Sequence, residues 1–296
     1  MKISPSLAKE LVETQFPQWE DLSVRPVEND GHDNRTFRLG EDMSVRLPTG
    51  ELYARHVGIE HDWLPFLSSR LPFPIPEPLG KGKPGSGYPW AWSINRWIPG
   101  EIASRNGIED LEQFASDLAE FLNAMQDIDA SEGPPPGPEN FYRGGNLAVY
   151  DSETRQCIET AGSQIDLEAA IGIWESALDA QSNEVPVWIH GDVAVGNLLV
   201  RDGRLCAVID FGQLAVGDPS CDLTIAWTFF TGVSRARFFQ EMRVFESAWI
   251  RARGWALWKA LLTLADEAVP ENRRNESRTV IEDLVAEQNR ESPTNR

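Results

Sequence analysis

Three oxygen-bearing side chains in the second half of the chain could support metal-assisted phosphoryl transfer. Asp192 follows a His-Gly pair, Asn197 lies five residues further on, and Asp210 opens an Asp-Phe-Gly triplet. Mg²⁺ prefers oxygen ligands and usually combines one or two protein carboxylates with substrate phosphates. Phosphoryl transfer needs one carboxylate to orient the attacking hydroxyl, and an Asn and an Asp to hold metal on the phosphates. We therefore predict that Asp192 is the catalytic base and that Asn197 and Asp210 bind Mg²⁺.

Short apolar runs must position these side chains. Three runs are too short for helices and are bounded by Gly or Asp, so we expect buried strands at Val187–Ile189, Leu198–Val200 and Leu205–Ile209. The pair Asp202-Gly203 predicts a tight hairpin between the last two strands, because both residue types tolerate the positive φ of such a turn. This hairpin would place Asn197, at the start of one strand, beside Asp210, at the end of its partner.

The ordered set resembles the signature of the aminoglycoside phosphotransferase family, which contains antibiotic and small-molecule kinases with a protein-kinase-like fold. Besides the three residues above, the matching positions are His190-Gly191, Phe211-Gly212, Gly217-Asp218-Pro219 and Asp222-Leu223. The resemblance implies that His190 supports the catalytic loop by packing and hydrogen bonding. We expect Asp218 and Asp222 to brace this loop and cap the following helix rather than perform chemistry, because Asp222 lies in the first turn of that helix, where a carboxylate is favourable.

The fold class that the resemblance implies is α+β, with two lobes. Residues 1–97 would form an N-terminal nucleotide-binding lobe, an antiparallel sheet with one principal helix. Residues 98–296 would form a larger, mainly helical lobe that carries the catalytic residues and binds the acceptor.

Length and composition indicate a globular protein with a substantial core. The chain has 296 residues, of which 41% are hydrophobic and 25% are charged, and these values exclude a disorder-dominated chain. No apolar stretch is long enough for a membrane span and no apolar signal core follows the first residue, so we expect a cytoplasmic protein. Three cysteines without paired metal spacing argue against disulfides and a zinc site.

The charge balance is acidic, with 27 basic and 46 acidic residues and a net charge of −19. Such a field repels nucleic acid and anionic membranes and attracts cationic small molecules. The expected partner is therefore a small-molecule hydroxyl acceptor, and the charge mildly favours a cationic one. Acidity also serves solubility, and the oligomeric state is left open.

The first hundred residues predict a helix and a small sheet. Helical spacing of apolar residues predicts a helix over residues 5–16, with Ser4 or Ser6 as its N-cap. Strands are expected at Leu22–Val27, Arg35–Leu39, Met43–Leu47 and Trp90–Trp97. In the resembled family the hairpin between the first two strands covers the nucleotide phosphates with backbone amides. The resemblance therefore implies nucleotide contacts at Gly31, His32 and Asn34.

Arg46 lies between two apolar residues of a predicted strand, where a guanidinium needs an anionic partner. In protein kinases this place holds a lysine that touches the nucleotide phosphates and pairs with a helix glutamate. Glu60 falls on the apolar stripe of a predicted helix over His56–Ser69, where an unpaired acid is costly. We therefore expect Arg46 to pair with Glu60 and to position the phosphates. A surface Arg46 and an exposed Glu60 are the simpler alternatives.

Two further regions are assigned by their order along the chain. Arg96, Trp97 and Ile98 would form the hinge that joins the lobes and receives the adenine edge through backbone groups. Helices are expected at Ile108–Asp127, Ile165–Ala180, Leu223–Phe230, Arg235–Ile250, Trp255–Ala265 and Arg278–Val285. Asp266 and Glu267 are candidates to meet a cationic acceptor, although a solvated helix end is the simpler interpretation.

Three functions fit these observations. The favoured one is transfer of the ATP γ-phosphate, with GTP as an alternative donor, to a hydroxyl of an aminoglycoside-type antibiotic, which would make the chain a resistance enzyme. A macrolide or small-metabolite kinase is the alternative within the same chemistry. A protein kinase is disfavoured, because the chain has no glycine-triplet loop and no activation loop before Pro219. A non-catalytic nucleotide-binding scaffold is disfavoured by intact Asp192, Asn197 and Asp210, although Arg46 in place of the usual lysine keeps it open.

Overall fold

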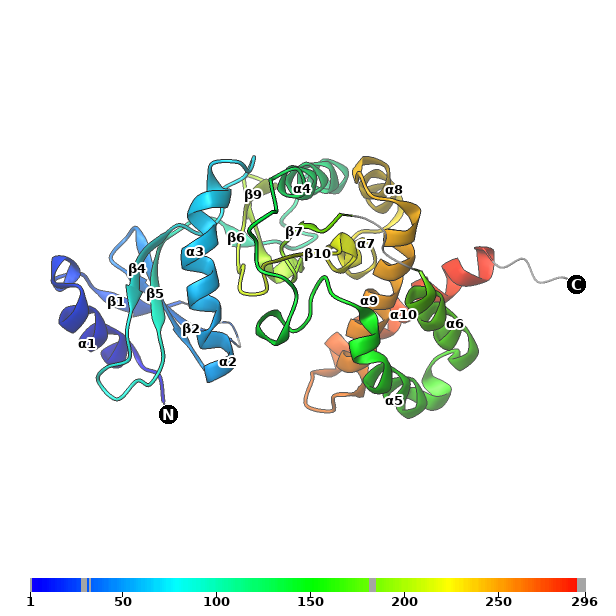
Figure 1. Cartoon of the computed structure of the whole chain (residues 1–296), viewed down its shortest axis with the longest axis horizontal. Helices are drawn as coiled ribbons and strands as arrows, with labels where there is room; N and C mark the ends of the chain where they lie inside the picture. The colour runs from blue at the N-terminus through cyan, green and yellow to red at the C-terminus, as the bar shows by residue number, and fades with distance from the viewer. Residues whose placement is uncertain (1, 28–30, 32, 181–184, 292–296) are drawn as a thin grey trace, which may run out of the picture.

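Two lobes form the protein, a small lobe built on a sheet and a larger lobe composed mainly of helices (Figure 1). The computed structural model describes residues 2–27, 31, 33–180 and 185–291. The N-terminus lies in the small lobe, and the last helix lies in the large lobe (Figure 1). The predicted α+β class is confirmed. The division at residue 97 stays a prediction.

The small lobe holds a five-stranded sheet in which every neighbouring pair is antiparallel. Its strand order is β1-β2-β3-β5-β4. The strands are β1 (Val24–Pro26), β2 (Asn34–Leu39), β3 (Met43–Pro48), β4 (Pro78–Gly82) and β5 (Trp92–Arg96). The predicted strands are present, and the first and last are shorter than expected. This sheet therefore places β3, which carries Arg46, at its centre.

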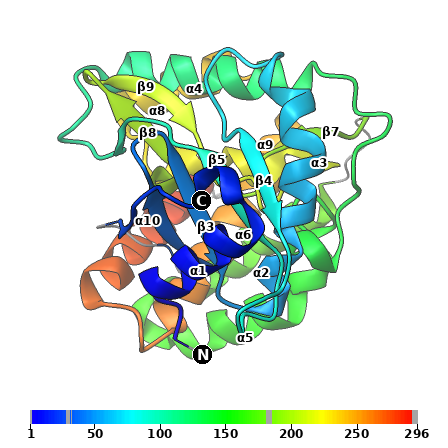
Figure 2. The same ribbon diagram turned by 90° about the vertical axis from the view of Figure 1, so that its left-hand side faces the viewer.

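Helix α1 (Pro5–Gln15) covers one face of the sheet, and Figure 2 shows it in front of β3 and β5. The Ser4 hydroxyl accepts a hydrogen bond from the Leu7 amide and caps the helix. Successive residues of a strand face opposite sides, so Val45 of β3 joins the apolar cluster under α1. Arg46 consequently points to the opposite face, toward helix α3 (His56–Ser68).

Helix α3, which follows the short α2 (Glu51–Ala54), connects the small sheet to the large lobe. Its residues Leu64 and Leu67 are fully buried in the core of the large lobe. The ring of Trp63 lies 5.0 Å from that of Trp188, measured between centroids, and His56 Nε2 donates to the Glu139 carbonyl at 2.9 Å. These contacts fix α3 against the large lobe.

The large lobe contains seven helices and two small sheets among its described residues. The helices are α4 (Leu111–Gln126), α5 (Asp151–Ala161), α6 (Leu167–Asp179), α7 (Ile225–Thr228), α8 (Gly232–Glu241), α9 (Glu246–Ala265) and α10 (Glu271–Glu291). One sheet pairs β7 (Val187–Ile189) with β10 (Ala215–Gly217). The other has the order β6 (Glu101–Ile102), β8 (Leu198–Arg201) and β9 (Arg204–Val208). No helix in the described part of the chain is long and apolar enough to cross a membrane.

The predicted helix boundaries between residues 235 and 265 are wrong. The chain leaves the helix after Glu241, and α9 then runs unbroken through Gly254. The Asn123 side chain permits the break, because its amide donates to the Glu241 carbonyl at 2.8 Å and accepts from the Arg243 amide at 2.9 Å. At Gly254 an added Cβ would lie 2.4 Å from the Cβ of Ala177, so this glycine allows α9 to approach α6. The helix predicted at Arg278–Val285 is likewise only the middle of α10.

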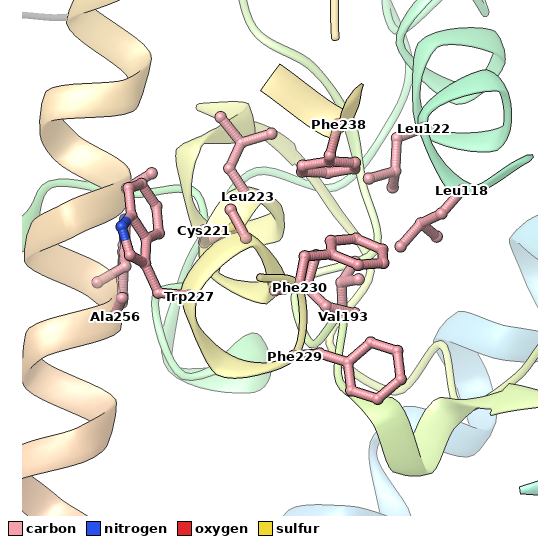
Figure 3. Close-up of a cluster of buried hydrophobic side chains, with 14 of the residues drawn as sticks. Leu118, Leu122, Val193, Cys221, Leu223, Trp227, Phe229, Phe230, Phe238 and Ala256 are labelled. Carbon is pink, nitrogen blue, oxygen red and sulfur yellow. The ribbon is translucent and has the colours of Figure 1, made fainter. Parts of the chain in front are cut away.

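The core of the large lobe anchors the loop that carries Asp192. Val193, the residue after Asp192, is 1% exposed and lies in an apolar cluster with Leu118 and Phe230 (Figure 3). Burial of such a side chain contributes roughly 1.5–3 kcal/mol. The cluster therefore holds the backbone next to Asp192 in place.

Candidate active site

The predicted hairpin forms and brings Asn197 to Asp210. The turn residues Asp202 and Gly203 have φ of 53° and 74°, as a tight hairpin between β8 and β9 requires. Beyond the paired strands, the Ile209 amide donates to the Asn197 carbonyl at 2.9 Å. Asp210 itself has φ of 68°, a costly conformation for a residue with a side chain. The backbone thus holds both proposed metal ligands at one end of the hairpin.

Asp222 and His190 brace the loop that carries Asp192. The Asp222 carboxylate is 1% exposed and accepts from the backbone amides of His190 and Gly191, both at 2.8 Å. Burial raises the pKa of Asp222, although His190 and these two hydrogen bonds oppose the rise. His190 Nε2 donates to the Ile209 carbonyl at 3.0 Å, and its Nδ1 accepts from the Asp192 amide at 3.2 Å. Both ring nitrogens of His190 are therefore engaged with backbone, which suits support rather than proton transfer.

Lys259 of α9 contacts the proposed catalytic base, and sequence reasoning missed it. Its Nζ lies 2.8 Å from Oδ1 of Asp192, while Asn197 Nδ2 donates to the Asp192 carbonyl at 2.9 Å. Burial opposes ionisation of Asp192, but Lys259, His190 and Arg143 outweigh it and hold the pKa of this carboxyl below its ordinary value. Asp192 is therefore a carboxylate at neutral pH. The only signal for Lys259 was a lysine among apolar residues of a helix, and that pattern does not identify a partner.

Arg46 joins the two lobes at the site. Its Nη1 lies 3.0 Å from Glu60 Oε1 and its Nη2 lies 2.9 Å from Asp210 Oδ1. Burial disfavours the guanidinium charge, but Glu60 and Asp210 outweigh it, so the pKa of Arg46 lies above its ordinary value. Glu60 is 4% exposed, so neither simpler alternative, a surface Arg46 or an exposed Glu60, holds. A planar fork can bridge two carboxylates in this way, whereas a lysine ammonium offers a single point charge.

The donor atoms of Asn197 and Asp210 fit a hard divalent cation. Because Asn197 donates through Nδ2 to the loop backbone, its Oδ1 is the atom left to act as a ligand. The side chain of Asp210 is 37% exposed and its Oδ1 accepts from Arg46, so Oδ2 is the oxygen left for a metal ion. Amide and carboxylate oxygens that combine with phosphate oxygens are the set that Mg²⁺ prefers.

The residues expected to contact the nucleotide base and phosphates lie along the small lobe. Gly31 is exposed and its carbonyl accepts from Arg35 Nη1 at 2.6 Å, and Asn34 begins β2 opposite Pro48. His32 lies outside the described residues. Neither Gly31 nor Asn34 contacts Asp192, Asn197 or Asp210 within the described residues, and their phosphate contacts stay a prediction.

The hinge residues follow β5 between the two lobes. Arg96 is exposed and its Nε lies 2.5 Å from Glu77 Oε2. The Trp97 amide already donates to the Asp42 carbonyl at 2.8 Å. Trp97 can therefore offer its carbonyl to an adenine edge, but not its amide. Ile98 is partly exposed and stands next along the chain.

Asp218, Asp266 and Glu267 lie apart from the reacting groups. The Asp218 carboxylate caps the short helix at Pro219–Thr224 through the Ser220 amide at 3.0 Å, and it forms a buried ion pair with Arg251 of α9. Asp266 and Glu267 are exposed beyond the end of α9, and Asp266 accepts from the Ala268 amide at 2.9 Å. Asp266 follows Lys259 by seven residues, which is about 10 Å along a helix. The structure therefore places neither residue next to Asp192.

Replacing Gly191 with Ala should destabilise the catalytic loop. Gly191 has φ of 82°, and an added Cβ would lie 2.3 Å from the Gln213 carbonyl oxygen. Backbone strain of this kind costs roughly 1–3 kcal/mol, and the close contact adds to it. Thermal or urea unfolding measures the loss. Gly196→Ala in the same loop is the matched control, because its added Cβ meets nothing within 4 Å, and equal losses in both variants would contradict this account.

Replacing Arg46 with Met should lower kcat/KM for the nucleotide by roughly 10- to 100-fold, the range for loss of a hydrogen-bonded charge. Arg46→Lys should retain more activity, because it keeps a cation within reach of one carboxylate or of the phosphates. Steady-state kinetics with varied nucleotide measures both. Arg25→Met is the control, since Arg25 forms an exposed pair with Glu41 in the same lobe. If KM for the nucleotide and kcat were unchanged in Arg46→Met, Arg46 would have no role in positioning the phosphates.

Comparison with known proteins identifies the family. No curated protein matches the chain. The fold is similar to that of aminoglycoside 2'-phosphotransferase-IIIa in its GDP complex, with a TM-score of 0.72, 19% identity, and coverage of 96% of this chain and 99% of that chain.

Two other similar structures come from phosphotransferases with different names. The streptomycin-ATP-APH(2")-IIa ternary complex has a TM-score of 0.59 at 18% identity and covers 97% of each chain. Macrolide 2'-phosphotransferase MphH from Brachybacterium faecium has a TM-score of 0.60 at 19% identity and covers 94% of this chain and 98% of that chain. At these identities the similarities show the fold.

The sequence itself matches the profile of the phosphotransferase enzyme family (APH) over residues 23–278. That range includes Arg46, Glu60 and the whole stretch from His190 to Asp222. The chain belongs to the phosphotransferase enzyme family.

Proposed function

We propose that the protein transfers the γ-phosphoryl group of ATP to a hydroxyl of a small molecule. The acceptor oxygen forms a bond to the γ-phosphorus, the bond from that phosphorus to the β,γ-bridging oxygen breaks, and ADP leaves. The hydroxyl proton passes to the Asp192 carboxylate and then to solvent. Family membership supports small-molecule phosphotransfer, and the donor nucleotide and the acceptor are part of the proposal.

The observation that carries the proposal is the shared position of Asp192, Asn197 and Asp210. The Asn197 side chain donates to the Asp192 carbonyl. The Asn197 carbonyl accepts from the amide of Ile209, the residue before Asp210. Asp192 is ionised and can accept the hydroxyl proton, whereas Asn197 and Asp210 would hold Mg²⁺. When bound, that ion would neutralise charge on the phosphates. Arg46, paired with Glu60, would orient the phosphates from the small lobe.

The donor nucleotide is proposed to be ATP, with GTP as the alternative. The similar structures are complexes with GDP in one case and with ATP in another. Adenine and guanine present different hydrogen-bonding edges to backbone groups of the hinge. The Trp97 amide is bonded to Asp42 and is not free to contact either base. Measuring how ATP and GTP compete as phosphate donors would identify the preferred nucleotide.

An aminoglycoside is the first acceptor to test and a macrolide the second. Streptomycin is bound in one similar structure, another is a macrolide 2'-phosphotransferase, and the net charge of −19 favours a cation. One feature weighs against a polycation, because the proposed base is paired with Lys259 rather than surrounded by further carboxylates. A neutral or anionic small metabolite is therefore the third candidate class.

The test is ADP formation from ATP in the presence of Mg²⁺ and a panel of kanamycin, streptomycin, erythromycin and small sugars or amino alcohols. We expect one class to stimulate ADP formation and EDTA to abolish it, because charge on the phosphates would no longer be neutralised. Stimulation that persists in EDTA would contradict the metal assignment. Tight nucleotide binding without turnover on any acceptor would favour a nucleotide-binding scaffold.

A further inference from the structure

Two cations from separate elements act on the proposed base. Lys259 of α9 lies 2.8 Å from Asp192 Oδ1, and its side chain is 37% exposed. Arg143, in the loop before α5, is near enough to help hold the pKa of Asp192 below its ordinary value. Acceptors must approach Asp192 to be phosphorylated. They therefore meet positive charge at the point of reaction, even though the protein as a whole is acidic.

Arg143 is held against α9, the helix that carries Lys259. Its Nε donates to Gln213 Oε1 at 3.0 Å, and its guanidinium carbon lies 4.4 Å from the ring centroid of Trp258, the residue before Lys259. Its Nη1 is buried and has no hydrogen-bond acceptor among the residues that the structure describes. A buried donor without a partner is costly. Arg143 thus has a guanidinium N–H donor that no described residue uses.

The loop around Arg143 is built to hold this position. Phe141 and Tyr142 both have φ of 53°, an unfavourable conformation for side-chain-bearing residues. Asn140 is 2% exposed and donates to the Arg143 carbonyl at 2.9 Å. The Tyr150 hydroxyl donates to the Phe141 carbonyl at 2.5 Å. Strain maintained by buried hydrogen bonds is typical of binding loops.

Apart from the proposed base Asp192, no carboxylate of the described residues forms an ion pair with either cation. In the described part of the chain Lys259 pairs with Asp192 alone, and Arg143 forms no ion pair. We propose, resting on the kinase function above, that the acceptor carries a carboxylate or phosphate near its reacting hydroxyl, and that Lys259 and Arg143 bind this anion.

The ion pair between Lys259 and Asp192 explains why an anionic acceptor would be preferred to a cationic one. Lys259 occupies Asp192 Oδ1, an oxygen that the acceptor hydroxyl needs for its proton. An anion on the acceptor offers Lys259 a new partner and so frees Asp192 as the hydroxyl arrives. An ammonium group in the same place would be repelled by both cations. The phosphoryl transfer itself is unchanged, with the proton passing to Asp192 and ADP leaving.

Sugars that share a ring but differ in charge test the proposal. ADP formation by the full chain with Mg²⁺ and ATP is measured with glucuronate, glucose 6-phosphate, glucose and glucosamine. We expect kcat/KM for one of the two anions to exceed that for glucosamine by roughly 10- to 100-fold, the range for a charge-assisted contact. The two anions separate a carboxylate site from a phosphate site.

Variants at Lys259 show whether this residue carries the selectivity. Lys259→Met keeps the length of the side chain and should lower the anion-to-cation ratio by about tenfold or more, while Lys259→Glu should invert it. Lys259 is partly exposed, so both variants should fold, and thermal unfolding checks this. Lys83→Met is the control, because Lys83 is exposed in the small lobe beyond β4.

The outcomes separate this proposal from the kinase function. A preference for glucosamine or kanamycin overturns the anionic acceptor, and Asp192-dependent ADP formation on kanamycin would leave the kinase function standing. A ratio unchanged by Lys259→Met also overturns it. If no anion is phosphorylated, their binding in the presence of Mg²⁺ and ADP is compared by calorimetry. Absence of any preference for the anions there overturns the proposal too.

Discussion

Replacing Asp192 with Asn should lower kcat by about 10²–10⁴-fold, the contribution of a positioned general base. The amide keeps the size of the side chain but cannot accept the hydroxyl proton. Asp192 does not touch Arg46 or Glu60, and its contacts are with Lys259, Asn197 and His190. The Kd for nucleotide should therefore stay nearly unchanged. Single-turnover kinetics and calorimetric titration with ADP measure the two quantities separately.

Loss of nucleotide binding together with turnover would contradict the role given to Asp192. Asn197→Asp serves as a comparison, because it preserves a ligand oxygen but removes the donor to the Asp192 carbonyl. We expect an intermediate kcat for that variant, since the loop backbone loses one hydrogen bond while the metal keeps its ligand. Full activity in Asp192→Asn would show that another group accepts the hydroxyl proton.

Replacing Arg251 with Met should destabilise the protein by about 3–5 kcal/mol, the range for removing one partner of a buried ion pair. The side chains of Arg251 and Asp218 are only 6% and 9% exposed, and Nη2 of Arg251 lies 3.2 Å from Asp218 Oδ1. Without the guanidinium, the Asp218 carboxylate would be buried without its counter-charge. The free energy of unfolding from urea titration measures the effect.

Arg243→Met is the matched control for this prediction. Arg243 forms an ion pair with Asp127 in which the two side chains are 60% and 64% exposed. Exposed pairs contribute at most about 1 kcal/mol, because water and salt screen them. Equal destabilisation by the two substitutions would show that the Arg251 pair contributes no more than a surface pair. The Asp218 amide also donates to the Gly144 carbonyl at 2.8 Å, so Arg251→Met should disturb the loop that carries Arg143 as well.

Local patterns were sufficient for the centre of the site. The hairpin at Asp202-Gly203 depends on turn chemistry within a few residues, and that hairpin alone brings Asn197 to Asp210. Arg46 and Glu60 could be paired in advance because each is a charge on an otherwise apolar face, where an unpaired charge is costly. The pair is present in the structure, and its role in positioning phosphates stays a prediction.

The predicted helix boundaries were wrong where a side chain far away in the sequence determines where the helix ends. Asn123 binds the backbone at both sides of the break after Glu241, and it is more than a hundred residues away along the chain. Gly254 lies inside α9, between the two helices predicted at Arg235–Ile250 and Trp255–Ala265, because contact with α6 requires a residue without a side chain there. Propensity is a weak prior, and tertiary contacts override it at such positions.

By itself, the sequence determined the strands and the hairpin that bring Asn197 to Asp210, because turns and apolar periodicity act over short distances. Its resemblance to a known family implied the α+β class. Only the tertiary structure decided which charges surround Asp192. Lys259 and Arg143 come from a helix and a loop that are far from Asp192 along the chain, and a lone lysine or arginine carries no local mark of its partner. The charge that an acceptor meets at the base is therefore a property of how the large lobe packs.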